Sequence, residues 1–151
     1  MRVDLEEIIY AMDFMDEGAG AYYHKKSEIV LSISQREYLA AKTGVEIDNY
    51  PEWQQEAVKW AYDIVENKES YIKLPDKLEF DDTTILKLFI KEIDESVREK
   101  IEADLSRGKD IRYIRENYSE IFDGEAWYEY KDNFFISLAK DWCKANNIIF
   151  N

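Results

Sequence analysis

A short basic segment stands out in an otherwise acidic chain, because its cations could hold an anion. Arg107, Lys109, Arg112 and Arg115 lie close together in the sequence, with Asp110 among them. Arg112 and Arg115 would share one face of a helix, and a helix that begins at Asp110 would offer free backbone amides nearby. Lys109, Arg112 and Arg115 therefore form a candidate site for phosphate or carboxylate. The alternative is that these arginines pair with the acidic segments on either side.

A second candidate is a run of aromatic residues, which comprises Trp127, Tyr128, Tyr130, Phe134 and Phe135. A single helix cannot bury all of these rings, and Tyr and Trp often anchor protein interfaces. The pattern predicts a partner-binding surface at Trp127, Tyr128 and Tyr130. The alternative places Trp127 and Trp142 in the core, which is the interpretation we favour for both tryptophans, with the tyrosine rings packed and their hydroxyls in water.

Residue types that usually carry catalysis are scarce. The sequence has one cysteine, Cys143, and one histidine, His24. Together they could form a nucleophile and base, but a buried structural cysteine is the commoner case. A single cysteine also excludes an internal disulfide and a Cys-rich zinc site. We therefore expect no catalytic residue, no metal site and no cofactor.

The composition restricts the classes of partner. The 151 residues include 33 acidic and 20 basic side chains, which gives a net charge of −13. Such a chain lacks the basic face that general nucleic-acid binding or docking on an anionic membrane requires. Residues 44–82 are especially acidic, and two interpretations stay open. The carboxylates could mimic nucleic acid and occupy the basic groove of an enzyme, or they could simply keep helix surfaces solvated, and interleaved lysines favour the second.

The elements that position these residues are mostly helices, since only five glycines and two prolines are present. Apolar spacing predicts about six helices, and caps mark several of their ends, with a box of Ser34 and Glu37, N-caps at Asp81 and Asp110, and a helix end at Gly44. Alternation predicts a hairpin at 21–25 and 28–33 with a short third strand at 71–74. Gly18 and Gly20 should end the first helix, and residues 148–150 should form a docked apolar tail. The sequence thus predicts one helix-rich α+β domain over residues 1–151, with a small antiparallel sheet wrapped by helices.

Four segments form a further pattern in the sequence. They are Tyr71-Ile72-Lys73-Leu74-Pro75, the basic segment Gly108-Lys109-Asp110-Ile111-Arg112-Tyr113-Ile114, the pair Trp127-Tyr128 with Glu129-Tyr130-Lys131-Asp132, and the closing Ala139-Lys140-Asp141-Trp142-Cys143. Together these segments resemble a bacterial family of small acidic proteins of uncharacterised function. The resemblance implies a bacterial or phage protein with a single cytoplasmic domain. It brings no catalytic residue with it.

Taken together, these features favour a non-enzymatic interaction or regulatory module that binds a protein partner through an aromatic surface. An acidic mimic of nucleic acid that antagonises a nucleic-acid enzyme is the alternative, and a hydrolase or nucleotide-handling enzyme with an arginine-lined anion site is a weaker one. The first residues carry acid where a signal peptide needs base, and no apolar run is long enough to span a membrane. We therefore expect a cytoplasmic protein with no membrane association.

Overall fold

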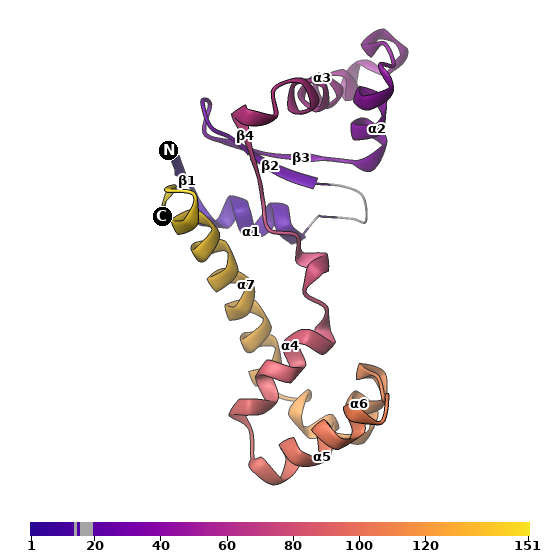
Figure 1. The fold of residues 1–151 in the computed structure, drawn as a ribbon, viewed down its shortest axis with the longest axis vertical. Coiled ribbons are helices and arrows are strands. Elements are labelled where there is room, and N and C mark those ends of the chain that lie inside the picture. The colour runs from indigo at the N-terminus through magenta and orange to yellow at the C-terminus, as the bar shows by residue number, and fades with distance from the viewer. Residues whose placement is uncertain (14, 16–19) are drawn as a thin grey trace. The chain divides into compact units, whose positions relative to one another are not determined.

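The computed structural model describes residues 1–13, 15 and 20–151 and is drawn in Figure 1. The described chain divides into two compact units. Unit 1 contains the described residues of Met1–Leu78 together with Leu138–Asn151, and unit 2 is Glu79–Ser137. The predicted helix end at Gly18 lies outside the described residues. The expectation of a single domain over 1–151 stays a prediction.

Helices dominate both units. Unit 1 holds α1 (Leu5–Asp13), α2 (Gln35–Thr43) and α3 (Glu52–Glu66), and unit 2 holds α4 (Asp82–Phe89), α5 (Glu95–Ser106) and α6 (Ile111–Asn117). The longest helix, α7 (Ala126–Ala145), contributes its first part to unit 2 and its last part to unit 1. No helix among the described residues combines the length and apolar character needed to cross a membrane.

Most helix ends follow the capping signals in the sequence. The predicted box at α2 is present, since Ser34 Oγ accepts from the Glu37 amide at 3.2 Å and Glu37 accepts from the Ser34 amide. Gly44 ends that helix with a φ of 74°, a left-handed conformation that glycine adopts without strain. Asp81 and Asp110 likewise cap α4 and α6 with their carboxylates.

The sheet of unit 1 has the predicted hairpin and the predicted third strand. Its order is β3 (Ile29–Ile33), β2 (Gly20–His24) and β4 (Tyr71–Lys73), and both pairings are antiparallel. The hairpin loop is longer than the two residues expected, because Glu28 adopts a φ of 58° and donates its amide to the His24 carbonyl at 2.9 Å. The C-terminal tail docks as a second, parallel pair in which β5 (Ile149–Phe150) lies beside β1 (Arg2–Val3).

Helices cover both faces of this three-stranded sheet. Figure 1 shows α2 and α3 on one side of the sheet and α1 on the other. On the first side, Ile33 and Tyr71 pack with Ala41, Ala61 and Ile64. On the other side Tyr23 is fully buried and donates its hydroxyl to the Arg2 carbonyl at 2.6 Å. The helix-rich α+β class with a small antiparallel sheet is therefore confirmed.

The core of unit 2 is built around one indole. The Trp127 side chain is fully buried, and its ring contacts the edges of Phe89 and Phe122 at centroid distances of 5.4 and 5.3 Å. Ile85, Leu86, Ile101 and Ile114 are also fully buried in this unit. Edge contacts between rings add to the free energy of burial, so Trp127 is the central core side chain of unit 2.

Replacing neighbouring aromatic residues should separate core from surface. Trp127→Ala should lower the free energy of unfolding by about 3–5 kcal/mol, because it leaves a cavity between two rings. Tyr128 is 56% exposed, and Tyr128→Ala should change that free energy by about 0.5 kcal/mol or less. Urea denaturation followed by circular dichroism measures both. Equal losses from the two variants would show that Trp127 does not hold the core of unit 2.

Candidate functional site

The basic segment is largely occupied by its own neighbours. Arg115 donates to Asp82 at 3.1 Å, and Lys131 lies 2.9 Å from the other oxygen of the same carboxylate. Arg115 also stacks on the Phe122 ring at 5.4 Å. Lys109 lies 4.8 Å from the centroid of the Tyr113 ring. The alternative, that the arginines pair with the acidic segments on either side, fits Arg107, which lies 3.8 Å from Asp104, whereas Arg115 pairs with Asp82 of α4. The anion site at Lys109, Arg112 and Arg115 stays a prediction.

One backbone amide at the start of α6 is also in use. Asp110 Oδ1 accepts from the Tyr113 amide at 3.0 Å, so the carboxylate stands where an anion would bind. Arg112 is exposed on this short helix. The geometry gives an external anion little to bind here besides the Arg112 side chain.

The predicted aromatic surface is divided between core and solvent. Trp127 is fully buried, so it cannot be part of an exposed partner-binding surface, and the prediction is corrected for this residue. Tyr130 packs its ring against Phe89 at 5.3 Å and is half-buried. Tyr128 alone of the three is widely exposed. A partner surface at Tyr128 and Tyr130 stays a prediction.

The structure does not bring Cys143 and His24 together. His24 lies on the face of the sheet that α2 and α3 cover, where its ring is 5.8 Å from Trp60 and 4.7 Å from Tyr71. Cys143 is fully buried near Tyr23, which faces the opposite side, and burial raises the pKa of its thiol. The cysteine is therefore a core side chain. Among the described residues, no three metal-binding side chains gather in one place.

A hollow of about 320 Å³ lies on the side of the sheet that faces α2 and α3. Its lining comes from five elements, namely Tyr22 of β2, Tyr38 of α2, Ile64 of α3, Lys68 of the 3-10 helix Lys68–Ser70, and Tyr71 and Lys73 of β4. We call this hollow the tyrosine–lysine pocket. Its volume is at the small end of the range for ligand sites.

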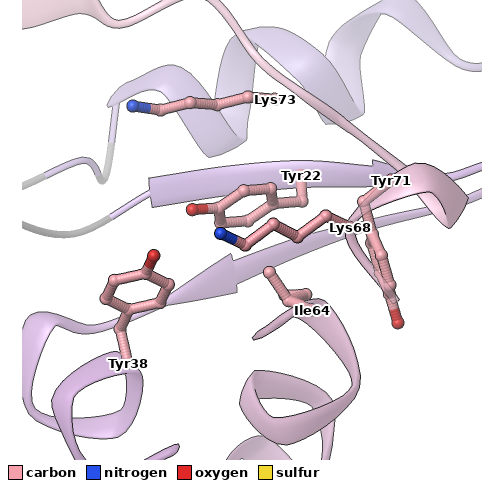
Figure 2. Close-up of a pocket in the computed structure, with 6 residues that line it drawn as sticks. All are labelled: Tyr22, Tyr38, Ile64, Lys68, Tyr71 and Lys73. Carbon is pink, nitrogen blue, oxygen red and sulfur yellow. The ribbon is translucent and has the colours of Figure 1, made fainter. Parts of the chain in front are cut away.

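The register of the sheet explains why these side chains meet. Side chains alternate between the two faces of a strand, and Tyr22 is paired directly with Lys73 across the β2–β4 ladder. Figure 2 shows that the Lys68 ammonium lies near the Tyr22 hydroxyl and that the Tyr38 hydroxyl points toward both. Polar ends from three separate segments therefore converge above the apolar Ile64 side chain.

One wall of the pocket is held rigidly. Tyr71 is buried, its ring meets the Tyr22 ring at 87°, and its hydroxyl hydrogen-bonds to the Asp63 carboxylate. Figure 2 shows this hydroxyl pointing away from the other polar groups. Asn67 donates to the same carboxylate at 2.6 Å. Tyr71 therefore supplies an aromatic surface to the pocket rather than a free donor.

Gly20 gives the Tyr22 ring its place. A Cβ atom on Gly20 would lie 3.0 Å from the Tyr22 hydroxyl oxygen and from a ring carbon. A side chain at this position would therefore push the Tyr22 ring away by a few tenths of an ångström. The position of the phenol in the tyrosine–lysine pocket thus depends on glycine two residues earlier.

The pocket lysines carry uncompensated charge. Neither Lys68 nor Lys73 forms an ion pair within the part of the chain that the structure describes, whereas Lys77 pairs with Asp13. A third cation, Lys42, lies 5.1 Å from the centroid of the Tyr38 ring. These lysines interrupt the acidic run of residues 44–82 at Lys68 and Lys73. The local charge of the pocket is therefore opposite to that of the whole chain.

The electrostatics of the pocket suit binding better than proton transfer. Burial, with a smaller contribution from Tyr38, raises the pKa of the Tyr22 phenol above its ordinary value of 10.0. Tyr22 therefore stays protonated near neutral pH and can donate a hydrogen bond. Ammonium groups and phenol donors together are suited to a carboxylate or a phosphate.

Sequence reasoning missed the pocket as a site. It noted the tyrosines of the hairpin and the strand at 71–74 as structural features only. A usable signal was present, because Tyr22 with His24 and Tyr71 with Lys73 are each spaced by two residues, which places them on one face of a strand. Tyr38 and Lys68 come from other segments, and no local pattern connects them to these strands.

Comparisons with known proteins identify no related protein. No model of a protein family, no curated protein and no solved structure matches the chain. The resemblance to a bacterial family of acidic proteins stays a prediction. The pocket must therefore be interpreted from its own chemistry.

The hydrogen bond between Tyr71 and Asp63 should make stability depend on pH. This bond lowers the pKa of Asp63 below its ordinary value of 3.8. Burial is the largest cause of the raised pKa of Tyr71, and the bond to Asp63 raises it further above 10.0. The hydrogen bond therefore stabilises the fold fully between pH 3.8 and pH 10.0, the ordinary pKa values of the two groups. This stabilisation is lost when the pH falls through the lowered pKa of Asp63. Tyr71→Phe should cost about 1–2 kcal/mol of unfolding free energy near neutral pH.

This cost should stay constant from about pH 7 to about pH 4 and should shrink as the pH is lowered further toward about 2, measured by urea denaturation of the wild type and the variant at each pH. Tyr22→Phe is the matched control, because the Tyr22 hydroxyl lies in the same pocket without a carboxylate partner among the described residues. A cost for Tyr71→Phe that stays constant with pH would contradict the role of Asp63.

Proposed function

We propose that this chain is a non-enzymatic interaction module that holds an anionic group of a partner protein, a carboxylate or a phosphate, in the tyrosine–lysine pocket. The observation that carries the proposal is the convergence of Lys68, Lys73, Tyr22 and Tyr38 around one hollow. In a chain of net charge −13, two lysines left without carboxylate partners among the described residues mark a local preference for anions.

The residues that line the tyrosine–lysine pocket are suited to an anionic group that is attached to an apolar or aromatic moiety. Ile64 and the rings of Tyr22 and Tyr71 provide apolar surface, while the ammonium and hydroxyl groups lie at one end. Such a division, with apolar walls and a few polar groups that fix orientation, is typical of binding pockets. The raised pKa of Tyr22 keeps a donor in place at neutral pH, which favours holding an anion over removing a proton.

Titration with small anions tests the proposal. Phenyl phosphate and benzoate, added to the ¹⁵N-labelled chain, should shift the amide signals of Tyr22, Tyr38, Lys68 and Lys73 in two-dimensional NMR spectra. Lys68→Met keeps the aliphatic stem but removes the charge, and it should weaken binding about fivefold or more. Lys26→Met, in the exposed hairpin loop, removes one charge outside the pocket and should leave the affinity unchanged. Shifts spread evenly over surface lysines, or equal affinities for the two variants, would overturn the proposal.

A substitution that keeps every charge tests the geometry. Gly20→Ala should displace the Tyr22 ring and weaken phenyl phosphate binding severalfold, because the added Cβ would crowd the phenol. The same NMR titration measures the affinity. Gly124→Ala is the control, since a Cβ there meets no atom within 4 Å. If Gly20→Ala binds phenyl phosphate as tightly as the wild type does, the phenol position is not part of the site.

A further inference from the structure

One edge of the three-stranded sheet is left open. The order β3-β2-β4 makes β3 and β4 the two edge strands. Along β2, the Ala21 carbonyl accepts from the Leu74 amide, and the Lys25 amide donates to the Ser70 carbonyl. The backbone amides and carbonyls of the odd-numbered residues therefore point toward β4. Backbone groups alternate in direction along a strand, and Tyr22, which pairs with Leu31, therefore bonds to β3.

This alternation fixes which backbone groups of β3 are free. Ile29, Leu31 and Ile33 bond to β2, so the amides and carbonyls of Val30 and Ser32 point to the outer edge. Within the described chain, neither residue has a hydrogen bond outside the ladder. An unpaired edge of this kind is a template for another extended chain.

The β4 edge differs, because two of its four outward backbone groups are already hydrogen-bonded. The Trp142 indole donates to the Lys73 carbonyl at 2.9 Å. The Tyr71 amide donates to the Lys68 carbonyl. The two edges of the sheet are therefore not equivalent, and only β3 presents a repeat of free donors and acceptors among the described strands of this sheet.

A groove of about 630 Å³ runs along the open edge between α1 and β3. Its lining includes the apolar residues Ala11, Ile29 and Val30 and the aromatic residue Tyr10. Its polar lining includes the carboxylates of Asp4, Glu6, Glu7 and Glu28, and none of its lining residues is a lysine or an arginine. Glu28 lies 3.8 Å from the N-terminal ammonium, and the other three carboxylates form no ion pair among the described residues. The groove is therefore acidic, whereas the tyrosine–lysine pocket is basic.

From these three features we infer that the β3 edge binds an extended, basic segment of a partner protein, which adds to the sheet as a further strand. The backbone groups of Val30 and Ser32 would pair with the segment. Alternate apolar side chains would lie on Ala11 and Val30, and lysines or arginines would face the carboxylates. A second copy of this chain fits the edge poorly, because two acidic grooves would face each other.

Matched peptides test the inference with the full-length chain. A nine-residue peptide of alternating lysine and valine should bind, as measured by isothermal titration calorimetry, and should shift the Val30 and Ser32 amide signals. A lysine–proline peptide has the same charge but lacks amide donors at every second residue, so it should bind at least about tenfold more weakly. A glutamate–valine peptide should not bind.

Variants of the protein distinguish backbone pairing with β3 from electrostatic attraction to the groove. Ser32→Pro removes a free edge amide, which edge strands tolerate, and should weaken lysine–valine binding about fivefold to tenfold. Glu6→Gln combined with Glu7→Gln should weaken it about fivefold at low salt, because two carboxylates of the groove are lost. Glu52→Gln combined with Glu56→Gln removes the same charge from α3, outside this groove, and should have no comparable effect.

The outcomes are decisive in both directions. Equal affinity for the lysine–valine and lysine–proline peptides would overturn strand addition, because charge alone would then explain binding. The absence of binding by the lysine–valine peptide would overturn the inference altogether, and so would equal losses in the two glutamine pairs. None of these results bears on the tyrosine–lysine pocket, whose variants are tested with phenyl phosphate.

Discussion

The position of β2 between two antiparallel ladders is the constraint on which unit 1 depends. Because its backbone bonds alternate between β3 and β4, its side chains must alternate between the two faces of the sheet. Tyr22 is thereby directed toward α2 and α3, while Tyr23 is directed into the opposite core, where its hydroxyl donates to Arg2. A shift of the strand by one residue would exchange these two tyrosines and remove the pocket.

The same alternation gives unit 1 two regions of opposite charge. The tyrosine–lysine pocket collects lysines that have no carboxylate partner among the described residues, whereas the groove between α1 and β3 collects carboxylates. In a chain of net charge −13 the acidic groove follows the average composition, and the basic pocket departs from it. These two regions would orient a partner that has separate anionic and cationic segments. The acidic groove repels the anionic segment, and the basic pocket repels the cationic one.

Local signals in the sequence predicted much of the fold and little of the site. Ser34 with Glu37, Asp81, Asp110 and Gly44 mark helix ends through contacts within a few residues, and the structure has each of them. The α+β class followed from such signals together with strand alternation. The pocket could not be predicted in this way, because Tyr38 and Lys68 reach Tyr22 only through tertiary packing. Trp127 illustrates the same limit, since neighbouring aromatic residues look alike in sequence while burial separates Trp127 from Tyr128.

The hydrogen bond from the Trp142 indole to the Lys73 carbonyl also bears on self-assembly. Fibrils grow when a sheet can accept strands at both edges, so that each added chain offers a new site for the next one. Here the indole occupies the Lys73 carbonyl, so a strand that pairs with β4 would have to displace Trp142 from it. This contact therefore disfavours endless growth of the sheet from its β4 edge.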